Sequence, residues 1–323
     1  MADEDGDSLT VVDAATNTVL TTLTGLHQPH NVQVGLDGAI VYALSGSDNV
    51  VVAIDPATYK VTAIAPTGPA PAHVIEAPNG TVYVTNSGDG TVSVYDGPGL
   101  SQTGRITVGG MPHGLRPAGN GSVIVVANTD AGALDVIDSA TNAVVGRVNV
   151  GSGPAQVAVG TDGRYAYAGI NKPSAVVKVD LVARKLVGSV PVPSQPVQLY
   201  LTPDDAILVS ANQGTQDKPG NTASLIDTAT MTVRSTVNAG SGPHGVTIDD
   251  TGTWAWITNS YDNTTTAIDI PTSSARATIQ TGARPNGISY SPRSVTPSGP
   301  TVTLTIPALP ASIQAPSGGH HGH

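Results

Sequence analysis

Histidine side chains recur at one place in a regular pattern of this sequence, close behind a proline. His30, His113 and His244 directly follow a proline of the pattern, and His73 comes two residues after one. His27 lies three residues before His30. Neutral imidazole nitrogens bind zinc and also suit copper, nickel and iron, so histidines that converge from distant parts of a chain can hold a transition metal without any cysteine. These five histidines are the candidate metal ligands.

The prolines belong to an internal repeat of the whole chain. A second column, of aspartates, keeps the same steps as the prolines, and each proline follows its aspartate at a constant distance. The step is about 42 residues, a period typical of stacked supersecondary units, and one step, from Asp180 to Asp227, is longer. The aspartates precede short turns, where we expect them to bond their own backbone. The two columns are Pro29, Pro71, Pro112, Pro154, Pro196, Pro243 and Pro285, and Asp13, Asp55, Asp96, Asp138, Asp180, Asp227 and Asp269.

One repeat contains four short segments that alternate in polarity and are rich in β-branched residues. In the repeat after Pro71, an apolar stretch from Val74 is followed by predicted strands at 81–85, 91–95 and 104–108, with turn residues between them. Four-stranded units at this period predict an all-β fold, a seven-bladed β-propeller of four-stranded antiparallel blades.

The two ends of the sequence carry complementary halves of a repeat. Predicted strands at 9–12 and 18–23 come before the first proline, and predicted strands at 288–291 and 301–306 follow the last one. We therefore expect a seventh blade closed by N- and C-terminal strands, which removes exposed sheet edges.

The repeat resembles that of the YVTN family of seven-bladed propellers. The segment 83–86 reads Tyr-Val-Thr-Asn, and variants of it recur at 125–128, 209–212 and 256–259. The resemblance covers roughly residues 8–307. It implies the fold and leaves the function open, because one propeller scaffold carries many activities.

In such a fold the first strand of every blade starts beside the central channel, just after the proline. The residues there are imidazoles or amides in every repeat, and His30, His113 and His244 are almost evenly spaced around a seven-membered ring. A distant resemblance is to nitrous oxide reductase, whose propeller hub holds copper through inward histidines. The predicted metal ligands are His30, His73, His113, His244 and His27, with Asn31, Gln156, Gln198 and Asn286 as further ligand-binding residues and copper or zinc as the metal. The alternative is that these are structural turns whose side chains bond backbone or water.

Composition excludes several other classes of function. The chain has no Cys, so neither disulfides nor thiolate sites arise. Its net charge of −10, with only 14 Lys and Arg, argues against nucleic-acid binding. There are two Glu residues, Glu4 and Glu76, so paired-carboxylate glycosidase chemistry would have to rest on Asp alone. No Gly-x-Ser-x-Gly segment is present, which argues against a serine hydrolase with that motif. No apolar run is long enough to span a membrane.

The predicted organisation is an N-terminal extension at 1–7, the propeller at 8–307 and a flexible tail at 308–323. The tail holds His320, His321 and His323, a second candidate metal site. The longest step of the repeat adds a loop at 213–221 that should overhang the histidine-bearing mouth, as a lid or a protein contact.

We therefore expect a binding protein that holds copper, zinc or a small polar ligand at the mouth of the channel, for sequestration or delivery. Composition and the family resemblance favour a secreted, periplasmic or envelope-attached location. The first alternative is a metal-free scaffold for another protein or for cell-wall glycan. The second is a hub-metal lyase or oxidase, which would need an open coordination position.

Overall fold

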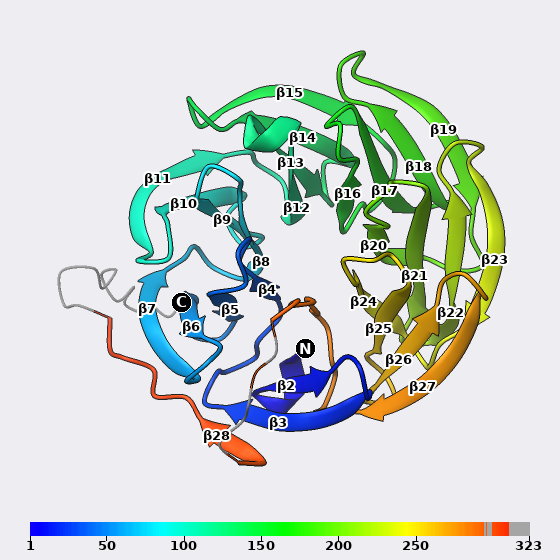
Figure 1. The fold of residues 1–323 in the computed structure, drawn as a ribbon. Helices are drawn as coiled ribbons and strands as arrows, with labels where there is room; N and C mark the ends of the chain where they lie inside the picture. Colours follow the sequence, from blue (N-terminus) through cyan, green and yellow to red (C-terminus); the bar gives the residue numbers. More distant parts are fainter. Residues whose placement is uncertain (294, 296–298, 310–323) are drawn as a thin grey trace, which may run out of the picture.

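The computed structural model describes residues 1–293, 295 and 299–309, which form seven four-stranded sheets around one axis (Figure 1). The predicted all-β propeller is confirmed. In six of the sheets the strands follow the chain order, antiparallel, from the hub to the rim. Two of these blades are β4 (Val32–Val34), β5 (Val41–Ser45), β6 (Val50–Asp55) and β7 (Lys60–Pro66), then β8 (Pro71–Glu76), β9 (Thr81–Asn86), β10 (Thr91–Asp96) and β11 (Ser101–Thr107).

The other four complete blades repeat this order. The first two are β12 (Pro112–Ala118), the 3-10 helix η2 (Gly119–Gly121), β13 (Val123–Asn128), β14 (Ala133–Asp138) and β15 (Ala143–Asn149), then β16 (Val157–Val159), β17 (Tyr165–Asn171), β18 (Ser174–Asp180) and β19 (Lys185–Pro191). The last two are β20 (Pro196–Leu201), β21 (Ile207–Thr215), β22 (Lys218–Asp227) and β23 (Thr232–Asn238), then β24 (Pro243–Ile248), β25 (Trp254–Asn259), β26 (Thr264–Asp269) and β27 (Ser274–Gln280).

The seventh blade joins the two ends of the described chain, as predicted. Its sheet is β1 (Ala2–Asp3), β2 (Ser8–Asp13), β3 (Thr18–Thr24) and β28 (Thr301–Thr303), with the 3-10 helix η1 (Glu4–Gly6) between β1 and β2. The part of the chain expected to be an extension, 1–7, therefore contains strand β1.

The C-terminal half of this blade differs in detail from the prediction. Strand β28 lies at the outer edge and runs parallel to β3. The segment 288–291 holds no strand, although its neighbour 285–287 is bonded to Ala2 through backbone amides at 2.8 Å. Its partner strand β1 is only two residues long, so the pairing stops there.

Apolar side chains fill the space between neighbouring blades, because each sheet is covered on both faces. One buried cluster combines Tyr83 and Val94 of one blade with Leu115, Ile124 and Ile137 of the next. At roughly 25 cal/mol per Å² of apolar surface, these contacts supply most of the stability of the ring. They also fix the angle at which each first strand meets the channel.

The polar residues of the repeat have structural partners. Asn86, the last residue of the Tyr-Val-Thr-Asn segment, is fully buried; its amide donates to Thr91 (2.9 Å) and Ser93 (3.0 Å), and its oxygen accepts from the amide of Gly68 (2.9 Å). In the aspartate column, Asp55 accepts the amide of Ala57 and the hydroxyl of Thr58 at 2.8 Å each. The predicted turn-bonding role is confirmed for six of the seven aspartates, and Asp96 is the exception.

The extra residues of the longest repeat lengthen a hairpin instead of forming an irregular loop. Strands β21 and β22 pair out to Thr215 and Lys218, which leaves only 216–217 at the turn. The base of the hairpin contacts the segments before β20 and β24, through Gly214 N to Gln195 O (3.1 Å) and Gly242 N to Gly220 O (2.9 Å). The hairpin therefore stands on the face of the ring where the first strands begin.

Among the residues that the structure describes, no helix combines the length and the hydropathy that a bilayer span requires.

Candidate metal centre

The inner strands bring four predicted histidines together at the hub. His73, His113 and His244 lie near the starts of β8, β12 and β24, and His30 lies two residues before β4. The ring centre of His30 is 5.8 Å from that of His73, 5.2 Å from that of His113 and 6.1 Å from that of His244, and the rings of His73 and His113 are 4.9 Å apart. Side chains from distant parts of the sequence therefore meet on one axis.

Three of these rings have the spacing of a metal site. A metal–nitrogen bond of about 2.1 Å, plus about 1.1 Å from nitrogen to ring centre, places two tetrahedrally bound imidazole centres about 5.2 Å apart. The three distances among His30, His73 and His113 lie on either side of this value. One ligand nitrogen from each lies within 4.8 Å of the others. Nitrogens on one tetrahedral ion are about 3.4 Å apart, so binding needs a contraction of at most about 1.4 Å.

Outer partners orient two of these rings for metal binding through Nε2. His113 Nδ1 is 2.9 Å from the carbonyl oxygen of Ala155, which only accepts, so Nδ1 carries the proton and Nε2 keeps its lone pair. His30 Nδ1 lies 3.5 Å from the carboxylate of Glu4, and its buried Nε2 has no hydrogen-bond partner among the described residues. A carboxylate behind the distal nitrogen is a common outer partner of metal-binding histidine.

The third ring, His73, has a different outer partner. Its Nδ1 is 3.3 Å from Nε2 of Gln156, while the other end of that amide accepts from the backbone of Val157 at 2.9 Å. The buried Nε2 of His73 has no partner among the described residues. With this amide orientation the proton of His73 sits on Nε2. Metal binding at Nε2 therefore requires the Gln156 amide to turn over, so that its oxygen accepts a hydrogen bond from Nδ1 and gives up the one from Val157.

Three of the four hub imidazoles have lowered pKa values. Burial, and after it the charge of a protonated His30, lowers the pKa of His113 and of His244 to about 3. The pKa of His73 is held well below 6.5, first by burial and then by His113 and His30. At pH 7 a metal ion would therefore not compete with a second proton on His73, His113 or His244, which favours binding.

Glu4 lies at the candidate site and is not among the residues that the sequence predicted. It lies in η1, beside His30, Asn286 and Arg284. Burial acts to raise the pKa of Glu4, but the hydrogen bond and charge of His30 and the charge of Arg284 outweigh it, so the net shift is downward. The repeat contains a signal for this position. Asp3 precedes Asp13 by the same number of residues as Asn86 precedes Asp96, so Glu4 corresponds to Ser87 in the repeat. Ser87 and Ser260, the counterparts of Glu4, bond the proline carbonyl of the next blade at the same mouth.

The remaining predicted residues fall into four groups. His244 adjoins the cluster, and its buried Nδ1 has no partner among the described residues, as is true of Nε2 of Gln198. Asn31 is buried and accepts from the amide of Val74 (3.2 Å), which gives it a structural partner. Asn286 is buried and accepts from Ser260 (3.0 Å), while its Nδ2 donates to the Glu4 carboxylate and lies 3.4 Å from Nδ1 of His30, so it adjoins the cluster. His27 is 60% exposed, pairs with Asp48 at 2.9 Å and is not part of the cluster. His320, His321 and His323 lie outside the described residues.

The glycine that follows several hub residues has a packing reason. A Cβ on Gly114 would meet the side-chain oxygen and the Cα of Gln156, the latter at 2.7 Å. A Cβ on Gly287 would lie 2.7 Å from the Cα of Asn31. At these two positions glycine therefore leaves room for the backbone of the neighbouring blade beside the channel.

The opposite mouth of the channel opens into a separate cavity of about 400 Å³. Its lining includes Arg116, Tyr200, Asp249 and Tyr290, at the far ends of the inner strands, and contains no hub histidine. Burial lowers the pKa of Arg116, whose Nη1 donates to the carbonyl oxygen of Leu115 at 2.9 Å. The histidine cluster is thus a site of its own at the other end of the channel.

Comparisons with known proteins agree on the scaffold. The model of the cytochrome D1 heme domain family matches residues 77–213, less than half of the chain. A solved structure of hydrazine synthase from Kuenenia stuttgartiensis is 21% identical, with a TM-score of 0.75 over 83% of this chain and 91% of that one. A protein of unknown function from Desulfotomaculum acetoxidans DSM 771 is 12% identical, with a TM-score of 0.76 over 88% of this chain and 96% of that one. No curated protein sequence matches significantly.

The histidine cluster does not fit a heme, although the family match raises that cofactor. A heme iron takes four nitrogens from its macrocycle and only axial ligands from the protein. Three imidazoles with centres 4.9–5.8 Å apart leave no free plane for the macrocycle. Of the three, only His113 lies within the matched residues 77–213. These comparisons therefore show the propeller fold, and membership of the YVTN family stays a prediction.

Proposed function

We propose that the protein binds one Zn²⁺ or copper ion at the hub, through His30, His73 and His113, and sequesters or delivers it. The observation that carries the proposal is the convergence of three buried imidazoles at the ring spacing of a metal site. The lowered pKa values of His73 and His113, and the outer partners on Nδ1 of His113 and His30, add to it. Three protein ligands leave the fourth position of a tetrahedral ion open, which allows exchange with an acceptor.

The proposed location is extracytoplasmic. It is supported by the composition, with 14 Lys and Arg and no Cys in 323 residues, and by the resemblance of the repeat to secreted propellers. The protein would carry the metal ion as a transported ligand, and because the chain has no Cys, none of its own thiolates would compete with the hub histidines for the ion.

Metal titration tests the proposal directly. The protein is stripped with chelator and titrated with Zn²⁺ and with Cu²⁺ by calorimetry, in a background where His320, His321 and His323 are replaced by Ala to remove the tail imidazoles. We expect one equivalent bound with a dissociation constant below about 1 μM, close to −8 kcal/mol. A parallel titration with hemin, followed by its absorption spectrum, should show no specific complex. Absence of tight metal binding, or a stoichiometric heme complex, would overturn the proposal.

Glu4 should tune the affinity of this site without being a ligand. The change Glu4→Gln keeps the size of the side chain and removes the negative charge behind Nδ1 of His30. Loss of an outer partner of this kind lowers metal affinity by about 10- to 100-fold. The matched control is Glu76→Gln, a carboxylate bonded to the amide of Leu36 and absent from the cluster. Equal affinities for the two variants would show that Glu4 plays no part in binding.

A second candidate function is a metal-free interaction scaffold, favoured by the lengthened β21–β22 hairpin at the same mouth. Loops and hairpins on a rigid scaffold are common sites of partner binding. The double change His113→Ala and His244→Ala separates the two functions. Loss of metal with the fold retained supports the metal site, and a protein that binds its partner equally well with and without both histidines supports the scaffold.

A further inference from the structure

One charged side chain stands among seven equivalent positions of the inner strands. Arg116 comes four residues after Pro112, in β12. The positions 116, 158 and 200 of this set line the cavity of about 400 Å³ at the mouth opposite the histidines. The repeat therefore places a single guanidinium in the wall of that cavity. The equivalent residues of the other six repeats are uncharged at neutral pH: Gln33, Ile75, Ala158, Tyr200, Thr247 and Ser289.

Arg116 lacks a carboxylate partner within the described part of the chain. Its side chain is half-buried, its Nη1 donates to the carbonyl oxygen of Leu115 at 2.9 Å, and its Cζ lies 5.8 Å from the ring centre of Tyr200. A guanidinium stays protonated in proteins, and a charge withdrawn from water is unfavourable without a partner. An anion in the cavity would supply that partner. The arginines that do pair with a carboxylate are Arg105, Arg147, Arg164, Arg276 and Arg284.

The acidic residues of the same cavity are bonded elsewhere. Asp205 Oδ2 accepts from the amide and from the hydroxyl of Thr161, at 2.7 Å each. Asp249 Oδ1 accepts from two backbone amides, at 2.8 Å each. Both residues line the cavity, together with the exposed Asp250. Their negative charges repel an anion of high charge, so a ligand with a single negative charge suits this lining best.

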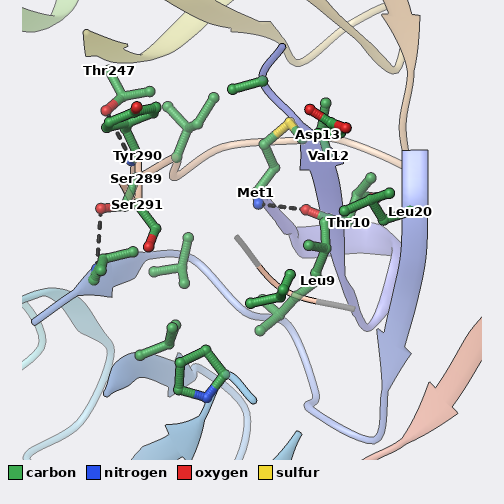
Figure 2. A pocket seen from close by; sticks show the side chains of 18 of the residues that line it. Met1, Leu9, Thr10, Val12, Asp13, Leu20, Thr247, Ser289, Tyr290 and Ser291 are labelled. Atoms are coloured by element: carbon green, nitrogen blue, oxygen red, sulfur yellow. Dashed lines mark hydrogen bonds between the residues drawn. The ribbon is translucent and has the colours of Figure 1, made fainter. Parts of the chain in front are cut away.

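Much of the remaining lining is apolar or aromatic. Val159 and Leu201 come from neighbouring blades, and Tyr290 contributes an aromatic ring. That ring stacks on Trp256 with centres 5.9 Å apart, and the amide of Tyr290 donates to Thr247 at 3.1 Å, which holds the residue in place (Figure 2). The cavity has the size of a small-molecule site, in which apolar walls bind the body of a ligand and a few polar groups orient it.

We propose that this cavity binds a small organic monocarboxylate. The carboxylate pairs with Arg116, and the apolar body packs against Tyr200, Tyr290 and the aliphatic walls. A guanidinium matches a carboxylate with two parallel hydrogen bonds, which orients the ligand as well as holding it. The inference goes beyond the proposed metal function and does not rest on it, because the lining of this cavity contains no hub histidine.

Titration of the full chain with phenylacetate and with hexanoate tests this proposal, followed by the chemical shifts of backbone amides. The protein is stripped with chelator, so that no metal ion holds the carboxylate. The neutral analogue phenylacetamide and inorganic phosphate are titrated in parallel. We expect at least one of the two carboxylates to bind with a dissociation constant below about 1 mM and to shift the amides of 116, 158 and 200. Phenylacetamide and phosphate should bind at least about 10-fold more weakly.

Two variants then assign the site to Arg116. Arg116→Gln removes the charge and should weaken carboxylate binding at least about 30-fold, the loss typical of removing one partner of a desolvated charge pair. Arg116→Lys keeps the charge without the paired donors and should bind with intermediate affinity. The matched control is Arg164→Gln, because Arg164 pairs with Asp180 outside the cavity, and it should bind as the parent does. Melting temperatures of the ligand-free variants report whether each one folds.

Four outcomes would overturn the proposal. Equal affinities for phenylacetate and phenylacetamide in the parent protein would show an apolar cavity without an anion site. Phosphate that binds as tightly as the carboxylates would show a site for inorganic anions. Undiminished binding by a folded Arg116→Gln protein would remove Arg116 from the site. Absence of binding by both carboxylates up to about 10 mM would leave Arg116 as a structural residue of the channel wall.

Discussion

Replacing His113 by Ala is expected to weaken metal binding at the hub by more than about 100-fold. Loss of an outer partner alone lowers affinity by about 10- to 100-fold, and His113 is proposed as a direct ligand whose Nε2 is held ready by Ala155. Its ring centre is 5.2 Å from that of His30 and 4.9 Å from that of His73, so its loss leaves only two of the three proposed ligands. The measurement is a calorimetric titration with Zn²⁺ in the background without tail histidines.

The matched control is His27→Ala, because His27 is exposed and paired with Asp48. It should bind metal as the parent does. Far-ultraviolet circular dichroism and the melting temperature of the metal-free His113→Ala protein should show that the fold is retained. If His113→Ala and His27→Ala bind Zn²⁺ equally well, the hub is not the metal site.

The metal-free protein is expected to lose stability steeply as the pH falls from about 6.5 toward 4.5. Burial lowers the pKa of His113 and His244 to about 3 and that of His73 well below its ordinary value. Below pH 6.5 the histidines bind protons in the unfolded chain but stay unprotonated where they are buried in the folded protein. The unfolded state then binds more protons, so a lower pH favours unfolding. Each such histidine contributes a slope of about 1.4 kcal/mol per pH unit between the two pKa values. Above pH 6.5 both states are neutral and the effect vanishes.

Urea unfolding at pH 7, 6, 5 and 4.5 measures this slope. The Asp residues with lowered pKa values have ordinary values near 3.8, so their loss falls mainly below this window. The variant His244→Gln should reduce the slope by about 1.4 kcal/mol per pH unit, whereas His27→Ala should leave it unchanged. A free energy of unfolding that stays constant between pH 7 and 4.5 would show that the hub imidazoles are hydrated and free to charge.

The repeat made the architecture and most of the hub predictable. A regular period with four alternating segments specifies blades, and closure around an axis then brings His30, His73, His113 and His244 together whatever their separation in sequence. The argument from the repeat does not predict the direction of the His27 side chain, because His27 lies outside the two positions that follow each proline. Nearness in sequence to His30 says nothing of direction, and the turn at 27–28 points that ring toward Asp48.

Other features depended on pairing that a pattern of alternation does not specify. The residues 301–303 alternate equally well at either edge of a sheet, so their parallel pairing with β3 at the rim could not be foreseen. Glu4 falls within the predicted extension 1–7, and the repeat places it in a column only when Asp3 is aligned with Asn86, a correspondence that the strand pairing confirms. The outer partner of His113, a backbone carbonyl, carries no sequence signal at all.

The most direct test of the metal site is an anomalous-difference map from crystals of the protein loaded with one equivalent of Zn²⁺, recorded at the zinc edge. The account predicts a single strong peak on the channel axis, about 2.1 Å from Nε2 of His30, His73 and His113, with the Glu4 carboxylate behind His30. A map with no peak at the hub, or with its only peak beside His27 and Asp48, would contradict it.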